Sequence, residues 1–394
     1  MILKRTFHPV GHGAFYTERF YDGNQNVANV VFDCGCYEAG KPGKSLADFR
    51  RQISDVVDQE FPLNEDEKVQ VDALFISHFH EDHINGIKRL LNNCDVQRII
   101  LPKLTDDAIL ELLIYKCIEA GSGVEDIISD FEDFRQSIND KKVEIDLQED
   151  NFNDDVKYET SDIENLVGTI SKPTIITMRG IWKYIPFSTK EKTSQLRQAL
   201  IAQINELASI LYVSPIDFRK LAKEFTKKMS LLDDCKSIYE SIFGIKKHNR
   251  YSLTLFSGTC DNTMNCPSYC HQGVKSLPRY CSKNCLYMGD FEADPKKTLT
   301  NTNCQQLLRF YHSYWDKIGI MQVPHHGSHD NMNEHLYKPA KLAVISAGMT
   351  DVYGHPHKVV IDELQKHQCV PLIVTEQETT VQKFTYEINC ANVM

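Results

Sequence analysis

Apolar and polar positions alternate along the first 35 residues, a period that is typical of paired strands. Residues 2–18 (ILKRTFHPVGHGAFYTE) and 27–35 (VANVVFDCG) flank a turn signal at 21–26 (YDGNQN), which predicts a β-hairpin with a glycine-rich corner. Residues 45–61 instead repeat apolar side chains at helical spacing, with Ser45 in an N-cap position. A helix is expected there.

Short apolar runs in the rest of the chain predict an α/β layout. The run 71–77 (VDALFIS) predicts a buried strand, and residues 87–93 (IKRLLNN) predict a helix beyond it. Further strands are expected at 96–103, 251–257, 285–292, 318–326, 341–348 and 370–376, with a helix at 356–367. A ligand-rich loop between a strand and a helix is the usual place for a site in such a layout.

The pattern changes between about Leu104 and His248, where helical periodicity dominates. Residues 193–211 and 214–229 carry it most clearly, and strand-like runs occur at 173–180 and 181–188. We therefore expect a mainly helical insertion over 104–248. It separates a first core segment, 1–103, from a second, 249–394.

Composition indicates a globular protein. The 394 residues are 42% hydrophobic, enough for one large core or two smaller ones. The N-terminal residues do not resemble an export signal, and no later stretch approaches the roughly 20 apolar residues that span a bilayer. A soluble, cytoplasmic protein without membrane contact is expected.

Net charge is unevenly distributed. The chain carries −10 overall, but residues 125–164 alone hold 15 Asp and Glu against four Lys and Arg. The acidic balance is therefore local, and it is more typical of a solvated face than of a partner-binding segment. It does not exclude a nucleic-acid partner for the remainder of the chain.

Metal-ligand side chains cluster in residues 77–83, SHFHEDH. Alternate residues of a strand end face the same way, so His78 and His80 can share one ion, and the following turn can bring Asp82 and His83 to a second. A polar loop that is rich in histidine by chance is the alternative, and four such residues in this order disfavour it. The spacing predicts two metals.

Three later strand ends offer further ligands. They are Asp290 in LYMGDFEAD, His325 and His326 in QVPHHGSHD, and His355 and His357 in DVYGHPHKV. Taken singly, the aspartate is more typical of a helix cap and each histidine of a loop or core residue. Their shared position after apolar strands favours a common site.

With these motifs the sequence resembles the metallo-β-lactamase superfamily, in particular the branch that holds the hydrolase domain of competence (DNA-uptake) proteins and the phosphorylcholine esterases. The markers are the GHGAFY corner, Asp33 in VFDCG, HFHEDH, GDFE, PHHGS and YGHPH. The resemblance covers the chain to about Leu101 and again from Arg250 onward. It implies a four-layer αββα sandwich in the α/β class.

The resemblance also implies a ligand set. His78, His80 and His326 would bind the first ion, while Asp82, His83 and His355 would bind the second, Asp290 bridging the two and Asp33 orienting ligands. His248 is an alternative to His326, and His357 is an alternative to His355. Nitrogen and oxygen ligands without thiolate favour zinc, with manganese or iron next.

Two such ions lower the pKa of a shared water and clamp a phosphoryl or carbonyl oxygen, so a metal-dependent hydrolase is expected. Asp82 or Asp290 would orient the water, and His325 would face the substrate as phosphate ligand or proton donor. A phosphodiesterase or nuclease is the first hypothesis. An ester or thioester hydrolase, or a partner-binding module with vestigial catalysis, is the alternative.

A second metal-like cluster lies in residues 260–285. Cys266, Cys270, Cys281 and Cys285 form C-x3-C-x10-C-x3-C, with Cys260 and His271 as spare ligands. Paired thiols on two short loops predict a structural zinc, and a redox switch or reduced loop cysteines are the alternatives.

Basic and aromatic residues of the insertion suggest nucleic acid or a nucleotide as substrate. The basic residues are Arg219, Lys220, Lys223, Lys227, Lys228, Lys246, Lys247 and Arg250, and the stacking candidates are Trp182, Tyr184 and Phe187. Lysines at helical spacing more often form a solvated face. A protein partner bound through the insertion or the acidic segment is a further hypothesis.

Overall fold

The computed structural model describes residues 1–64, 67–120, 124–147, 152, 155–189, 194–208, 229–243, 252–260, 283–293, 302–337 and 340–388. These fall into two compact units. Unit 1 comprises Met1–Pro102, Lys141–Lys190 and Tyr251–Met394, and unit 2 comprises Lys103–Asp140 and Glu191–Arg250.

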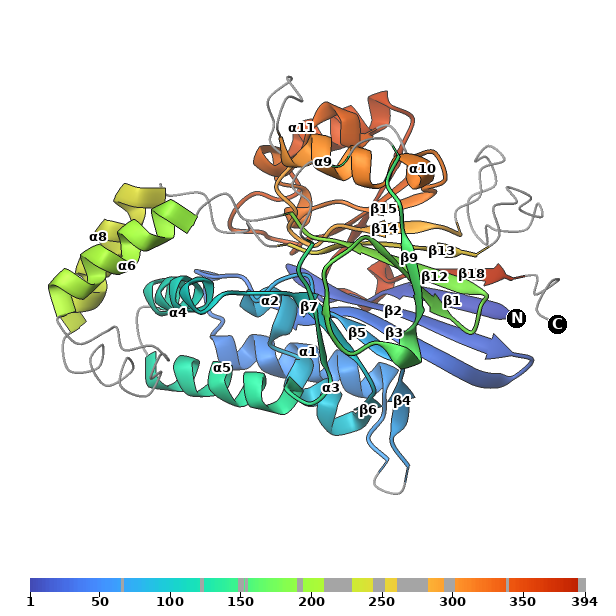
Figure 1. Ribbon diagram of the computed structural model, residues 1–394, viewed down its shortest axis with the longest axis horizontal. Helices are drawn as coiled ribbons and strands as arrows, with labels where there is room; N and C mark the ends of the chain where they lie inside the picture. Colours follow the sequence, from blue (N-terminus) through green and yellow to red (C-terminus); the bar gives the residue numbers. More distant parts are fainter. Residues whose placement is uncertain are drawn as a thin grey trace. The chain divides into compact units, whose positions relative to one another are not determined.

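Two large sheets form the centre of unit 1 (Figure 1). Among the described residues, the first sheet runs in the order β10 (Gly168–Ile170), β8 (Lys142–Ile145), β7 (Ile99–Pro102), β5 (Ala73–Phe75), β3 (Gln25–Cys36), β2 (Gly13–Asp22), β1 (Ile2–Phe7) and β18 (Gln382–Glu387). The second runs β17 (Val370–Val374), β16 (Leu342–Ser346), β15 (Ile320–Gln322), β14 (Cys285–Tyr287), β13 (Thr254–Thr259), β12 (Trp182–Phe187), β11 (Thr174–Met178) and β9 (Glu159–Asp162).

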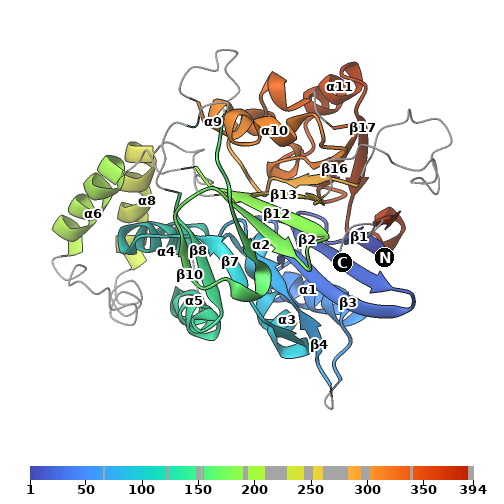
Figure 2. The same cartoon turned by 45° about the vertical axis from the view of Figure 1, so that its right-hand side comes forward.

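Helices cover the outer faces of both sheets (Figures 1 and 2). Beside the first sheet lie α1 (Leu46–Glu60), α2 (Glu81–Ile84) and α3 (Ile87–Asn93), together with the short pair β4 (Val69–Val71) and β6 (Cys94–Val96). Beside the second lie α9 (Asn303–Phe310), α10 (His312–Trp315) and α11 (Lys358–Lys366). This is the four-layer α/β sandwich that the sequence predicted.

The predicted hairpin and first helix form as expected. β2 pairs with β3 antiparallel around the turn at Gly23. α1 begins behind Ser45, whose side chain accepts a hydrogen bond from the backbone of Asp48, while the Asp48 carboxylate accepts one in return from the backbone of Ser45. This reciprocal capping explains why the helix begins where it does.

The core lies between the two sheets. It includes Phe7 and Phe32 from the first sheet and Tyr287 and Val344 from the second, all of them buried.

One charged pair of the first sheet is buried in this core. Arg5 Nε donates to Glu18 Oε1 at 2.7 Å, and the Tyr184, Ser257 and Tyr287 hydroxyls also donate to Glu18. The network joins the first sheet to strands β12, β13 and β14 of the second. Its partners satisfy the buried charges, as such a position requires.

The insertion predicted over 104–248 is interrupted in the structure. Residues 141–190 belong to unit 1, because their strands extend both sheets: β8 pairs with β7, and β12 pairs with β13. The physical reason is backbone pairing, since the strand-like runs at 173–180 and 181–188 need neighbours for their N–H and C=O groups.

Unit 2 holds the helical residues of the insertion. Its helices are α4 (Asp106–Ala120), α5 (Val124–Ile138), α6 (Ser194–Ala208) and α8 (Met229–Phe243). Glu111 of α4 accepts hydrogen bonds from Arg197 of α6 at 2.9 Å and from Tyr239 of α8 at 3.3 Å, so one buried carboxylate ties three helices together. None of the helices in the described ranges is both long and apolar enough to cross a membrane.

Candidate metal centre

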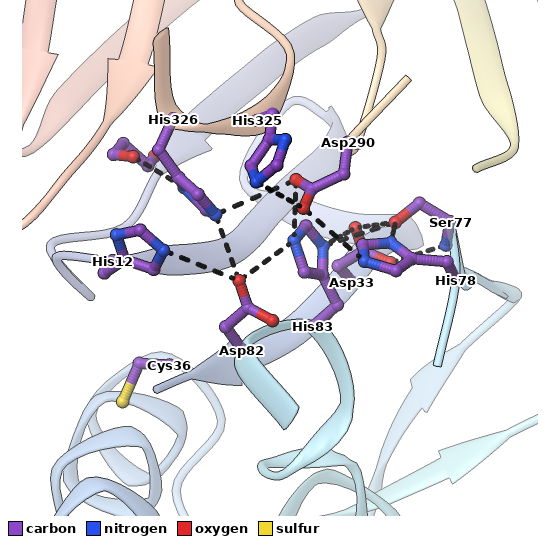
Figure 3. Close-up of polar contacts among 12 residues, drawn as sticks. His12, Asp33, Cys36, Ser77, His78, Asp82, His83, Asp290, His325 and His326 are labelled. Carbon is purple, nitrogen blue, oxygen red and sulfur yellow. Dashed lines mark hydrogen bonds and ion pairs between the residues drawn. The ribbon is translucent and has the colours of Figure 1, made fainter. Parts of the chain in front are cut away.

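Loops from both sheets of unit 1 converge on one group of histidines and aspartates (Figure 3). β5 leads to His78 and α2, and it runs parallel to β3, which carries Asp33. β14 leads to Asp290 and β15 to His325 and His326, and these two strands are also parallel. Parallel neighbours end at the same edge of a sheet, which is why residues far apart in the sequence meet here.

The first donor group consists of His78, His80 and Asp290, whose ligand atoms all lie within 4.8 Å of one another. His78 Nε2 is 3.6 Å from Asp290 Oδ2. That nitrogen is buried and has no hydrogen-bond partner among the described residues. Leaving a buried polar atom in this state is unfavourable unless a ligand such as a cation engages it.

The second donor group consists of Asp82, His83, Asp290 and His326, all four buried. Asp82 Oδ2 lies 3.0 Å from His326 Nε2 and 3.5 Å from His83 Nε2. His83 Nε2 is buried and lies 3.1 Å from Asp290 Oδ1. Imidazole and carboxylate donors suit zinc, and also manganese or iron.

Asp290 belongs to both groups. Its Oδ2 faces His78 at 3.6 Å and His325 at 3.9 Å, while its Oδ1 faces His83 at 3.1 Å and His326 at 3.7 Å. One carboxylate therefore presents a separate oxygen to each side. This is the position that a bridging ligand needs.

Asp33 contacts His83, a member of the second donor group, at the ring nitrogen that does not face the other donors. Its Oδ2 lies 2.8 Å from His83 Nδ1, and it accepts hydrogen bonds from the backbone and the hydroxyl of Ser77 at 2.6 and 2.7 Å. A carboxylate on Nδ1 keeps the proton there, so His83 presents Nε2 as a lone-pair donor. This geometry suits the orienting role predicted for Asp33.

The ionisation of the groups suits a cation. Burial alone would raise the pKa of Asp82 and of Asp290, but neighbouring imidazoles hold both pKa values below their usual range. Burial would lower the pKa of His83, yet Asp82, Asp290 and Asp33 raise it well above its usual value, so an ion at Nε2 has to displace a proton there. Burial keeps the pKa of His78 well below its usual value. Ionised carboxylates and a neutral imidazole are the forms that bind divalent ions.

The backbone is shaped to bring these groups together. A Cβ on Gly35 would lie 2.6 Å from the carbonyl carbon of Asp82, so only glycine lets β3 approach the ligand loop this closely. His325 and His326 both adopt left-handed backbone, with φ of 49° and 54°. Non-glycine residues in that region cost on the order of 1–3 kcal/mol each and cluster at functional sites.

The structure groups two predicted ligands differently from the expectation. His326 lies with Asp82 and His83 rather than with His78 and His80. His355 lies with His12 and Asp351 in a third group. The grouping depends on which side of Asp290 the loops of His326 and His355 approach, and residue spacing does not encode this.

Of the two alternative ligands, only His357 lies within the described residues. His357 accepts a hydrogen bond from the backbone of His329 at 2.9 Å, and His248 lies outside the described residues.

Sequence reasoning assigned no role to His12 or Asp351. His12 was visible only as the residue between two glycines of the GHGAFY corner, and Asp351 only as a neighbour of the YGHPH turn. In the structure, His12 Nε2 lies 4.0 Å from Asp82 Oδ2.

Cys266, Cys270 and Cys281 lie outside the described residues. Cys285 is fully buried in β14, and burial raises the pKa of its thiol to about 12. The structural zinc stays a prediction.

The predicted stacking surface is wrong for its aromatic members. Trp182, Tyr184 and Phe187 are fully buried in β12. Trp182 and Tyr184 pack against Phe20 and Phe75 of the first sheet, whereas Phe187 packs on the other face against Phe310 of α9. The basic residues at 219–228 and 246–250 lie outside the described part of the chain.

Comparison with known proteins identifies the fold. Residues 27–158 match the metallo-beta-lactamase superfamily. The chain thus contains a domain of this superfamily, whose members are mostly metal-dependent hydrolases, and the predicted resemblance is confirmed. The match includes Asp33 and the His78–His83 motif, whereas Asp290 and His326 lie beyond it and join the centre through the fold.

The chain is also similar to ComE operon protein 3 of Bacillus subtilis (strain 168). The two are 37% identical over 68 residues, which is 17% of this chain and 9% of that relative's length.

Proposed function

We propose that this chain is a dinuclear metal-dependent hydrolase whose substrate is a phosphodiester. The observation that carries the proposal is the position of Asp290, which presents one oxygen to each of two donor groups. The first ion would be held by His78, His80 and Asp290. The second would be held by the same aspartate together with Asp82, His83 and His326.

Two divalent ions held there would supply Lewis-acid polarisation of the substrate and a nucleophile at neutral pH. The chain's own residues would do the rest. Asp82 and Asp290 would orient the attacking water. His325, whose side chain is 30% exposed beside the buried carboxylate of Asp290, would bind a phosphoryl oxygen or donate the proton of Nε2 to the leaving oxygen.

The choice of a phosphodiester rests on the resemblance to the branch of the superfamily that carries the PHHGS motif. Both histidines of this motif face Asp290. Nucleic acid and nucleotides are the substrate classes to test first. An ester or thioester hydrolase would use the same ions. A module with vestigial catalysis is disfavoured, because binding a partner gives no physical reason to keep His78 Nε2 buried without a hydrogen-bond partner among the described residues.

The test compares wild type with His80→Ala and Asp290→Asn. Metal content is measured by elemental analysis, and hydrolysis is measured with bis-p-nitrophenyl phosphate and p-nitrophenyl acetate in parallel. His367→Ala is the matched control, because His367 contacts Glu363 on the surface of α11 and no residue of the centre.

We expect wild type and His367→Ala to bind metal and to cleave the phosphodiester, and both centre variants to lose metal and at least about 100-fold in rate. Cleavage of the acetate alone would move the ester hydrolase to first place. If neither reporter is cleaved, the assay is repeated with single-stranded DNA and cyclic nucleotides. Metal binding without hydrolysis of any of these substrates would favour the binding module. A metal-free wild type would overturn the proposal.

A further inference from the structure

Three histidine nitrogens surround a single oxygen of the second donor group. Asp82 Oδ2 lies 3.0 Å from His326 Nε2, 3.5 Å from His83 Nε2 and 4.0 Å from His12 Nε2 (Figure 3). The third histidine comes from the corner between β1 and β2. Its ring packs against that of His326, with centroids 3.8 Å apart.

Each of the three rings has its other nitrogen engaged by an oxygen. His83 Nδ1 lies 2.8 Å from Asp33 Oδ2, His326 Nδ1 lies 2.9 Å from the carbonyl of Ser346, and His12 Nδ1 lies 2.5 Å from Asp351 Oδ2. A carboxylate or carbonyl can only accept, so the proton sits on Nδ1 in every case. In the neutral form, all three rings therefore present Nε2 as a lone-pair donor.

Asp351 is built to hold His12. Its side chain is 1% exposed, and its other oxygen accepts hydrogen bonds from the backbone of Tyr353 at 2.8 Å and of His355 at 3.2 Å. The pair Asp351 and His12 thus repeats the pair Asp33 and His83.

We propose that His12 is a further donor to the ion of the second group, and that Asp351 is its positioning residue. This rests on the metal centre proposed above. Donor atoms about 2.1 Å from one ion lie roughly 3–4 Å apart, and the distance from His12 Nε2 to Asp82 Oδ2 falls within that range. With His12, the second ion would have a fifth protein donor beside the four of the second group.

The assignment gives His355 a different place. In the structure its ligand atom gathers with those of His12 and Asp351, and its ring centroid is 5.9 Å from that of His12 and 6.5 Å from that of His326. His12 therefore lies closer to the second donor group than the histidine that the sequence had favoured.

The experiment measures binding of Co²⁺ to the chelator-treated full chain, by calorimetry and by the visible absorption of the bound ion. The variants are His12→Gln, Asp351→Asn and His355→Gln. His8→Gln is the matched control, because His8 is a buried histidine near the same corner whose Nε2 contacts Thr17 instead of the centre. Ions bound elsewhere in the chain are common to all five proteins.

We expect His12→Gln to weaken one of the two ions of the centre by about 100-fold and to change its absorption, and Asp351→Asn to weaken the same ion by about 10-fold. His8→Gln should match wild type. Wild-type affinities and spectra in His12→Gln would overturn the inference while leaving the metal centre intact.

Two further outcomes are decisive. Loss of the second ion in His355→Gln alone would return the ligand role to that residue. A wild type that binds no Co²⁺ would overturn the metal centre itself, and the inference with it. If His12→Gln fails to fold by circular dichroism, Asp351→Asn decides, because an unchanged spectrum and affinity in that variant contradict its positioning role.

Discussion

Asp33 Oδ2 lies 2.8 Å from Nδ1 of His83, a contact that joins β3 to the helix carrying the metal-ligand motif. Asp33→Asn removes the charge that fixes the imidazole tautomer. We expect the affinity for the second ion to fall by about 10–100-fold, measured by competition with a chelator. Asp72→Asn is the control, because Asp72 is a buried aspartate that accepts from the backbone of Asn29 instead. Equal affinities in the two variants would contradict the orienting role.

Gly35→Ala tests the close approach of β3 to the ligand loop. Its Cβ would lie 2.6 Å from the carbonyl carbon of Asp82, so α2 has to move. We expect a loss of about 1–3 kcal/mol in unfolding free energy, together with weaker metal binding. Gly23→Ala serves as the comparison, because its Cβ meets nothing within 4 Å although φ is +58°. It should lose some stability through backbone strain and bind metal normally.

Glu18→Gln tests the buried charged pair that Arg5 and Glu18 form within the first sheet. The substitution leaves the guanidinium of Arg5 buried without its counter-charge, and breaking such a pair costs about 3–5 kcal/mol. Chemical denaturation would measure the loss. Lys172→Ala, at an exposed ion pair with Glu159, should change the unfolding free energy by about 1 kcal/mol or less. A similar small effect for Glu18→Gln would show that the buried pair contributes little.

His8 makes the stability of unit 1 dependent on pH. Burial lowers the pKa of His8 to about 3, whereas the unfolded chain has the ordinary value near 6.5. Between these values the unfolded state binds a proton that the folded state does not, so stability falls as the pH drops through this window. From pH 7 to pH 5 the loss is about 2 kcal/mol. His8→Gln should lack this share of the acid sensitivity, and equal pH profiles for the two proteins would disprove the assignment.

Much of the fold could be predicted from the sequence, because it depends on local periods. The helix that begins after Ser45 and the buried strand within 71–77 both carry local patterns, which predict these elements without knowledge of their tertiary contacts. The strands at 142–145 and 168–170 were missed, since their short mixed sequences gain strand structure only from neighbours in the first sheet. The predicted ligands that the structure brings together come mostly from dense motifs such as HFHEDH and PHHGS.

His12 shows why the rest of the centre could not be found in this way. A single histidine in a glycine corner is uninformative until the fold places it beside Asp82. Its partner Asp351 lies 339 positions away, a distance over which no spacing rule operates. The grouping of His326 failed for the same reason, because it depends on which side of the bridging aspartate its loop approaches.

The wide separation of these residues also sets the order of events during synthesis. Asp82 follows a strand of the first sheet, and Asp290 and His326 follow strands of the second, so a partly translated chain has the HFHEDH motif but not its counterparts. The complete set of donors is available to an ion only after the last of these loops has left the ribosome. Metal binding at the proposed centre would then be a late step, because its donors meet only after both sheets have formed.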